Sequence, residues 1–386
     1  MYSKIKVAFD SQIFSAQTYG GVSRYYYELI GELNKKKSFS AILVAPFFIN
    51  KYVKNIITEG FFFPSICQRL PLKFFGINRR YFINFERLIG IFLSYVYLSV
   101  SRPKIIHETY YLPFGIGFSS AIRVLTIYDM IHEIFPELFG DHDLTSSFKR
   151  IAVNRADHII CISKATKNDL MKFFGIPEEK ISVVYLAPST NSLRVFSNEV
   201  LRLGTRPYLL YVGSRRGYKN FINFLNGYIR SSFLKDNYGI ICFGGGEFDF
   251  EERKILNQYG LLSDMDSKVK HISGDDLLLG SYYKNASVFV YPSRYEGFGL
   301  PPLEAMSHDC PVACSQASSI PEVVGNAASY FDPENVEEIT SAIEKILIEP
   351  GFREELIKRG RQRLKHFSWE KCATETENVY ANLLKD

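Results

Sequence analysis

Residues 287–321 read SVFVYPSRYEGFGLPPLEAMSHDCPVACSQASSIP and contain the most informative pattern in the chain. It begins with an apolar run, 288–291, whose β-branched and aromatic residues favour a buried parallel strand. A loop with two glycines follows, and a segment with proline in its first turn then predicts the start of a helix. A strand, a glycine turn and a helix N-terminus together favour anion binding, so the stretch predicts a phosphate-bearing ligand.

Two glutamates bracket the glycine turn. Glu296 lies in the loop and Glu304 in the first helical turn, so both can face one ligand, one at each end of it. Carboxylates accept hydrogen bonds from hydroxyl groups, which suits sugar and ribose rings, whereas phosphates suit the glycine N–H groups between them. An alternative stays open, in which Glu304 is only an acid favoured by the helix dipole and the glycines only make a turn.

The length and composition predict a two-domain globular protein. A chain of 386 residues is too long for one comfortable core, and 23 % charged residues exclude a disordered class. No apolar run reaches the roughly 18 residues that span a bilayer; the nearest is 88–100. The first ten residues enter a strand pattern without a signal-peptide core, so we expect the chain in the cytoplasm.

Neither cysteines nor acidic pairs predict a metal site. The six cysteines are scattered, and Cys310 and Cys314 have no second pair to complete a zinc site, so buried free thiols are expected. The two Asp-x-Asp strings, 141–143 and 264–266, do not follow long buried strands, as a metal site of that kind requires. We therefore expect no metal and no cofactor.

The net charge of +5 is unevenly distributed. Residues 1–190 hold 23 Lys and Arg against 15 Asp and Glu, whereas residues 191–386 hold 23 against 26. The basic excess is densest in 35–104, with twelve basic and two acidic residues among many aromatics, including 61–63, 73–75 and 79–82. Such a surface would attract an anionic membrane or a lipid-diphosphate acceptor rather than nucleic acid. A solvated helix face over a core is the alternative.

Each half of the chain repeats strands, glycine loops and helices. In the first, a strand at 5–10 precedes Gly20 and Gly21, which open a helix over about 25–34, and further strands are predicted at 41–45, 104–107, 123–128 and 180–185. A helix is predicted near 81–98, and residues 154–166 predict a helix end, a buried strand and a new helix capped by Ser163. In the second, a strand at 207–212 leads to a turn with Arg215, Arg216 and Lys219, and strands at 239–243, 269–272 and 313–315 follow. This predicts two Rossmann-like domains that face one another with a ligand in the cleft between them.

The motifs resemble family 4 of the retaining, nucleotide-sugar-dependent glycosyltransferases. EGFGLPPLE at 296–304, CPV at 310–312 and SIPEVVG at 319–325 are similar to the family's donor-binding region, and the Gly20 loop is similar to its N-terminal glycine loop. The resemblance implies the GT-B fold. It implies a first domain over 1–187 for the acceptor, a linker over 188–206, a nucleotide-sugar domain over 207–365, and a terminal helix over 366–386 that crosses back to the first domain.

The resemblance also implies the residues of the site. Glu304 would hold the ribose, two cations would hold the diphosphate, and Glu296 with the neighbouring backbone would orient the sugar. The implied donor-binding residues are Gly20, Gly21, Arg215, Lys219, Gly297, Phe298, Gly299, Leu300 and Glu304; the implied catalytic residues are Glu296, Asp129 and His132. Because the loop is short for the family, Arg216 could replace Arg215.

One position departs from the family pattern. Where the family has His-Asp after a strand, this chain has Tyr128 followed by Asp129. His132, or the backbone of Tyr128, could then take the place of the histidine beside the sugar. The departure concerns only the sugar side of the site.

The resemblance predicts a metal-independent retaining hexosyltransferase. Residues 20–26, 128–137 and 213–220 are most similar to bacterial mannosyltransferases of O-antigen and capsule assembly, which favours GDP-mannose as donor and a lipid-linked surface polysaccharide as acceptor. The basic aromatic surface would then hold the enzyme at the cytoplasmic face of the inner membrane. The alternatives are a UDP-hexose donor, a non-catalytic nucleotide-sugar-binding scaffold of the same fold, and a phosphorylase.

Overall fold

The computed structural model describes residues 4–56, 58–64, 79–118, 120–188, 206–262 and 267–385, with side chains from residue 85 onward in the third range. The chain forms two compact units: Met1–Leu186 with Trp369–Asp386, and Ala187–Ser368. Most of the predicted linker, 188–206, and the aromatic segments 73–75 and 79–82 lie outside the described side chains. The units are described one at a time below.

The first unit is built on a seven-stranded parallel sheet of order β3-β2-β1-β4-β5-β6-β7. Its inner strands are largely buried apolar runs, as parallel strands covered by helices require, whereas the edge strand β3 is partly exposed. The predicted strands are confirmed, and the edge strand β3 is an addition that the sequence did not predict. The strands are β1 Ile5–Phe9, β2 Phe39–Phe48, β3 Glu59–Pro64, β4 Ile105–Glu108, β5 Ile122–Ile127, β6 His158–Cys161 and β7 Ile181–Val183.

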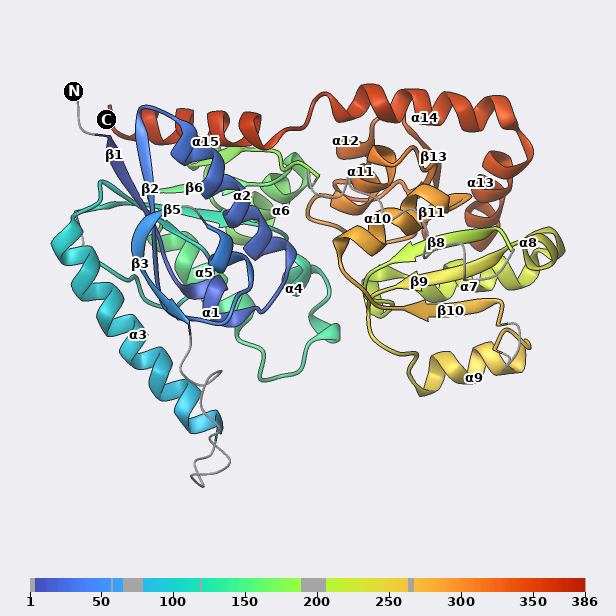
Figure 1. Cartoon of the computed structure of the whole chain (residues 1–386), viewed down its shortest axis with the longest axis horizontal. Coiled ribbons are helices and arrows are strands. Elements are labelled where there is room, and N and C mark those ends of the chain that lie inside the picture. Colours follow the sequence, from blue (N-terminus) through green and yellow to red (C-terminus); the bar gives the residue numbers. More distant parts are fainter. Residues whose placement is uncertain are drawn as a thin grey trace. The chain divides into compact units, whose positions relative to one another are not determined.

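Helices cover this sheet (Figure 1). The face of α2 that carries Tyr26, Ile30 and Leu33 is buried, a helical spacing of three to four residues. Ser163 begins α6 as predicted, because its side chain accepts a hydrogen bond from the Thr166 N–H. The helices are α1 Gln12–Ala16, α2 Gly21–Lys35, α3 Arg79–Ser101, α4 Ile131–Ile134, α5 Thr145–Arg155, α6 Lys164–Phe174 and α15 Trp369–Leu383, with 3₁₀ turns at Tyr52–Asn55, Pro136–Leu138 and Glu178–Lys180.

The terminal helix α15 is part of the first unit. It packs against α2, where Trp369 lies beside Tyr25 with ring centroids 6.3 Å apart. Further along α15, the Tyr380 hydroxyl lies 2.6 Å from His107 Nδ1 in the core. The second nitrogen of His107 lies 2.7 Å from Thr126 Oγ1, so this histidine is a buried structural residue.

The second unit repeats the same winding in a six-stranded parallel sheet of order β10-β9-β8-β11-β12-β13. Its strands are β8 Tyr208–Val212, β9 Gly239–Phe243, β10 Val269–Ile272, β11 Val288–Tyr291, β12 Val312–Ser315 and β13 Ala328–Phe331. Its helices are α7 Phe221–Arg230, α8 Ser232–Asn237, α9 Phe250–Gln258, α10 Asp276–Asn285, α11 Leu300–Ser307, α12 Ile320–Val324, α13 Val336–Ile348 and α14 Pro350–Leu364, with a 3₁₀ turn at Gly217–Lys219.

In both sheets the order in which successive strands are added reverses at one point. In the first unit the strand order turns between β1 and β4, and in the second between β8 and β11, where Val288 pairs with Leu209. In open parallel sheets ligands bind beyond the carboxyl ends of the strands at this reversal point. The loops after β8 and β11 carry Arg215, Lys219 and Glu296, so the fold brings these predicted site residues to one edge of one sheet.

Candidate functional site

The site in the second unit is centred on an ion pair. Lys219 Nζ lies 2.7 Å from Glu296 Oε1, although the two residues are 77 positions apart in sequence. Their side chains are 21 % and 10 % exposed, so the pair is shielded on most sides but still reaches solvent. A partly buried ammonium at a strand's carboxyl end is suited to a diphosphate, and the carboxylate beside it is suited to hydroxyl groups.

The backbone of the Glu296 loop is held by two serines just before α12. Ser319 Oγ donates to the carbonyl oxygens of Glu296 and Phe298, at 2.8 and 2.7 Å, and Ser318 Oγ donates to Glu296 O at 2.7 Å. The Phe298 ring packs edge-on against Phe367 within the unit. The backbone of the turn, rather than the Phe298 side chain, is therefore available to a ligand. The sequence alone gives no sign that these two serines hold the loop.

The glycine turn leads directly into α11. Gly299 is the residue before the helix and has φ of +115°, a left-handed conformation that side chains other than glycine rarely adopt. A Cβ at Gly299 would meet no atom within 4 Å, so the constraint is conformational rather than steric. Leu300 begins α11, and Gly297 and Phe298 complete the predicted donor loop.

Tyr291, at the end of β11, is hydrogen-bonded to the Glu296 carboxylate. Burial raises the pKa of the Tyr291 hydroxyl well above its usual range, and the charge of Glu296, to which it is hydrogen-bonded, raises this pKa further. Tyr291 therefore stays protonated and donates to the carboxylate. The Lys219 ammonium also lies over the Tyr291 ring, 5.9 Å from its centroid. Tyr291 was predicted only as a strand residue, because an aromatic in a buried run gives no functional signal.

Glu304 lies at the other end of the turn, on the first part of α11. It is buried, at 9 % exposure, and the Tyr283 hydroxyl approaches its Oε2 at 3.4 Å. Tyr283 comes from α10 and stacks on His308. A carboxylate this buried is more than a solvated first-turn acid, and its position beside the glycine turn fits the predicted ribose contact.

Arg215 is engaged within the protein. Its Nε donates to Glu252 Oε1 at 2.8 Å, and its Nη2 donates to Glu252 Oε2 and to the carbonyls of Gly246 and Glu247 at 3.2, 2.8 and 2.9 Å. Its Nη1 donates to Gly244 O at 3.2 Å. Nη1 and Nη2 thus hold the loop after β9, Nε holds Glu252 of α9, and the residue is 5 % exposed.

The loop that Arg215 holds packs tightly. Gly244, Gly245 and Gly246 all have φ between +74° and +78°, and a Cβ on Gly245 would collide with the Gly213 carbonyl. The loop ends at Asp249, which begins α9 in a capping box with Glu252. Arg215 therefore joins the end of β8 to the end of β9.

Arg216, the alternative phosphate ligand, has the opposite environment. Its side chain is 77 % exposed and its Nε lies 3.2 Å from Asp249 Oδ2. It borders a hollow of about 380 Å³ that Asn223, Glu251 and Arg294 also line. An exposed guanidinium can turn toward a ligand at low cost, so the structure leaves Arg216 more available than Arg215.

In the first unit, Gly20 and Gly21 begin α2. Gly20 is the residue before the helix and its carbonyl accepts from Ser23 Oγ and from the Arg24 N–H, both at 3.0 Å. A Cβ on Gly20 would collide with the Gln17 carboxamide oxygen, a buried atom with no hydrogen-bond partner among the described residues. Side-chain-free backbone at a helix N-terminus is consistent with a diphosphate contact.

The Tyr128 side chain, which stands where the family has histidine, is directed into the core of the first unit. Its hydroxyl lies 2.6 Å from the Tyr26 hydroxyl and 3.3 Å from Thr109 O, and burial raises its pKa well above the usual range. The hydroxyl therefore acts as a core hydrogen-bond donor at physiological pH.

Asp129 and His132 follow Tyr128 in the loop after β5. Asp129 Oδ1 accepts from the Ile131 N–H at 3.2 Å, and its carbonyl accepts from the buried Lys149 at 3.0 Å. His132 stacks on Phe139, and its Nδ1 is buried without a partner in the described part of the chain. Burial, with Lys149 nearby, lowers the pKa of His132, so its ring is neutral at pH 7. A neutral ring with an unpaired nitrogen remains suited to a hydroxyl group.

Asp10, at the end of β1, is a buried acid that sequence analysis did not select. Its Oδ1 accepts from Thr109 Oγ1 at 2.6 Å, and its Oδ2 accepts from Gln12 Nε2 at 2.6 Å. Burial, with the charge of Glu108 as a second cause, raises its pKa from 3.8 to about 6. The strand ending Phe9-Asp10 was visible in the sequence, and a carboxylate closing a buried strand could have marked it.

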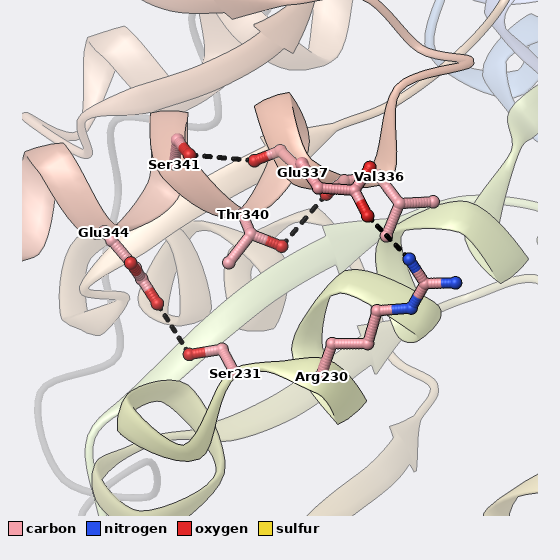
Figure 2. Close-up of a pocket in the computed structure, with 7 residues that line it drawn as sticks. All are labelled: Arg230, Ser231, Val336, Glu337, Thr340, Ser341 and Glu344. Atoms are coloured by element: carbon pink, nitrogen blue, oxygen red, sulfur yellow. Dashed lines mark hydrogen bonds and ion pairs between the residues drawn. The ribbon is translucent and has the colours of Figure 1, made fainter.

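A second hollow, in the second unit, is lined by polar side chains that pair with one another. A hollow of about 260 Å³ between α7 and α13 is lined by Arg230 and Glu337, which pair at 2.6 Å, and by Ser231 and Glu344, also at 2.6 Å (Figure 2). Residues 4–56, 58–64, 79–118, 120–188, 206–262 and 267–385 contain no group of three or more potential metal ligands. Five cysteines are buried free thiols, and Cys67 lies outside the described residues.

Comparison with known proteins identifies the family. The profile of "Glycosyltransferase Family 4" matches residues 19–190, and that of "Glycosyl transferases group 1" matches residues 195–363. The chain belongs to glycosyltransferase family 4. The family 4 chain is 33 % identical over 236 residues to "O-antigen chain mannosyltransferase B" of Escherichia coli and 28 % identical over 231 residues to "O-antigen chain mannosyltransferase RfbU" of Salmonella typhimurium.

These matches cover 59 % and 58 % of this chain, and 61 % and 60 % of the two relatives. Solved structures confirm the fold of the family 4 chain. Sucrose-phosphate synthase from Thermosynechococcus elongatus superposes with a TM-score of 0.73 at 20 % identity, covering 99 % of this chain and 100 % of that one. A glycosyltransferase from Rickettsia africae gives a TM-score of 0.69 at 15 % identity, with both chains fully covered. The predicted GT-B fold, with its two parallel α/β sheets, is confirmed.

Proposed function

We propose that this family 4 chain transfers a hexose from a nucleotide sugar to a hydroxyl group with retention of anomeric configuration. The observation that carries the proposal is the Lys219–Glu296 pair beside the glycine turn at the reversal point of the second sheet. In that geometry a cation can bind the diphosphate while a carboxylate, 2.7 Å away, binds sugar hydroxyls.

We assign each residue a role that its surroundings support. Glu304 binds the ribose, Lys219 binds the diphosphate together with Arg215 or Arg216, and Glu296 with the backbone of 297–300 orients the sugar. Gly20 and Gly21 are assigned to the same diphosphate, and Asp129 and His132 to the sugar, by the family resemblance and by the free backbone and unpaired ring nitrogen at these positions.

The reaction requires no protein nucleophile. The bond between the anomeric carbon and the phosphate oxygen breaks while the acceptor oxygen bonds to the same face of the sugar. The acceptor's proton passes to the departing phosphate oxygen, and Lys219 stabilises the negative charge that this leaving group develops. Glu296 holds a sugar hydroxyl and does not itself exchange a proton, since it is already paired with Lys219.

Mannose from GDP-mannose is the proposed donor sugar, and a lipid-linked surface polysaccharide such as O-antigen is the proposed acceptor. The support is the similarity to two proteins whose names are O-antigen chain mannosyltransferases. A UDP-hexose is the second candidate. A lipid-linked acceptor also accounts for the basic, aromatic stretch at 35–104, through which we propose that the protein associates with the membrane surface.

The donor is identified by calorimetric titration with GDP, UDP and their mannose, glucose, galactose and N-acetylhexosamine conjugates, with and without EDTA. The expected result is that one GDP-sugar binds in both conditions and that Lys219→Ala and Glu304→Ala abolish binding. Lys254→Ala, an exposed lysine of α9, is the matched control and should bind like wild type. If only a UDP-sugar binds, the proposed donor changes from GDP-mannose to that sugar. If no conjugate binds, the transferase proposal is contradicted.

A further inference from the structure

Helix α3, Arg79–Ser101, is apolar on two opposite faces. The inner face packs on the first sheet, where Leu98 belongs to a core cluster with Ile42 and Ile106, and Ile91 and Tyr97 pack against that cluster. Ser94, on the same face, is fully buried. This contact alone accounts for one apolar face of the helix.

The outer face is apolar as well, and in the described residues nothing covers it. Its members recur at helical spacing of three and four residues, so they share one side of the helix opposite Leu98. They are Phe85, Leu88, Phe92, Tyr95, Val96 and Val100, with exposures of 59, 67, 65, 51, 44 and 80 %. We call these six residues the α3 stripe.

Helix α3 also contacts the edge strand β3, through Tyr97 of its inner face. The Phe61 ring of β3 stacks on Tyr97 of α3 with centroids 5.4 Å apart, and Phe63 lies edge-on to Phe61 and is 52 % exposed. Figure 1 shows α3 running along this edge of the sheet. Soluble proteins rarely expose this many large apolar side chains together unless the surface binds something.

The charges around the α3 stripe are mostly basic. Within the described part of α3 and the turn after it, the exposed charged residues are Arg87, Arg102 and Lys104, whereas Glu86 is buried. Glu59 of β3 is the exposed acid on the neighbouring strand. Residues 35–104 as a whole hold twelve Lys and Arg against two Asp and Glu. This charge complements anionic headgroups, and the α3 stripe complements the acyl region below them.

We propose that the α3 stripe is the surface by which the first unit lies on an anionic lipid bilayer. The helix rests in the interface and does not cross it: among the described residues no helix is long and apolar enough to span a bilayer. The inference deepens the proposed function, on which it rests for the lipid-linked acceptor, and it assigns the membrane contact to six named side chains.

The test is co-sedimentation of the full chain with phosphatidylcholine vesicles containing about 30 mol% phosphatidylglycerol, and with pure phosphatidylcholine vesicles. Wild type is expected to bind the anionic vesicles and to bind the neutral ones more weakly. The double variant Leu88→Ser/Phe92→Ser should lower the partition coefficient at least about tenfold, because two apolar side chains that the bilayer would bury are replaced by polar ones.

The matched control is Phe250→Ser/Tyr259→Ser, which removes two side chains that are 78 % and 50 % exposed in the second unit. It should bind vesicles like wild type. Equal binding by the stripe variant, or no binding by wild type, would overturn the proposal. A wild-type dimer that the stripe variant converts to a monomer, without vesicle binding, would overturn it in favour of a second copy as occupant.

Nucleotide-sugar hydrolysis without vesicles separates this inference from the transferase proposal. The stripe variant should hydrolyse donor at the wild-type rate, because the α3 stripe includes no predicted donor residue. If the wild-type protein hydrolyses donor but does not bind vesicles, only the membrane proposal is contradicted. If it binds vesicles but does not hydrolyse donor, only the transferase proposal is contradicted.

Discussion

Replacing Arg215 by glutamine is expected to destabilise the second unit by about 3–5 kcal/mol, the usual cost of leaving one charge of a buried pair without its partner. The estimate rests on the geometry of the pair: Arg215 is 5 % and Glu252 6 % exposed, and the two are joined by contacts of 2.8 and 3.2 Å. The carbonyls of Gly244 and Gly246 lose their donors in the same variant. Arg216→Gln, at a side chain 77 % exposed, should cost less than about 1 kcal/mol.

The assay must report the second unit specifically. The sole tryptophan, Trp369, lies in the first unit, so its fluorescence follows that unit during denaturation. Hydrogen exchange of peptides from β8 and β9 in increasing urea follows the second unit instead. Glu252→Gln is the matched variant, and it should cost a similar amount because it leaves Arg215 as the unpaired charge.

The opposite pattern would refute this reasoning. If Arg215→Gln unfolds within about 0.5 kcal/mol of wild type and yet loses nucleotide diphosphate binding, then Arg215 is a free phosphate ligand, as the family resemblance implies. If Arg216→Gln loses diphosphate binding at unchanged stability, the phosphate contact belongs to Arg216.

Three further predictions concern single residues. Asp10→Asn should stabilise the first unit above pH 6. The raised pKa means that the contribution of Asp10 to stability is most favourable below pH 3.8 and is lost as the pH rises to about 6, a difference of roughly 3 kcal/mol that the asparagine avoids. Rotation of the Gln12 carboxamide would offer its unpaired Oε1 to the new amide, and Trp369 fluorescence in urea at pH 4 and 7 measures the difference; equal pH slopes in both proteins would contradict it. Glu296→Gln should lower kcat/KM for donor hydrolysis roughly 10- to 100-fold, since a charged hydrogen bond to the sugar is lost, whereas an unchanged rate would remove Glu296 from the site. Tyr128→Phe should cost about 1–2 kcal/mol with turnover unchanged, because its hydroxyl bonds inside the core; lost turnover at wild-type stability would place it on the substrate.

The strand, glycine turn and helix of the donor loop could be predicted because each is specified locally. The apolar run at 288–291, the left-handed glycine at 299 and the prolines after it determine β11 and the start of α11 without distant contacts. The alternation of such units also predicted both parallel sheets, since parallel strands need helical crossovers.

Contacts between distant segments could not be predicted. Nothing in the sequence indicates that Lys219 pairs with Glu296, or that Arg215 is bound by Glu252 from a later helix. Tyr128 faces inward because Tyr26, 102 residues earlier, supplies its partner. Helix α3 was predicted as a helix, but an apolar pattern on both faces does not distinguish a buried helix from one with an exposed apolar face.

The most direct test of the transferase proposal is hydrolysis of GDP-mannose in the presence of EDTA, followed by nucleotide release and by the anomeric signal of the freed mannose. The account predicts slow hydrolysis by wild type with the α anomer released first, no hydrolysis by Lys219→Ala, and a wild-type rate for Lys254→Ala. Hydrolysis that persists in Lys219→Ala, or that releases the β anomer, would contradict the site at the Lys219–Glu296 pair or the retaining mechanism.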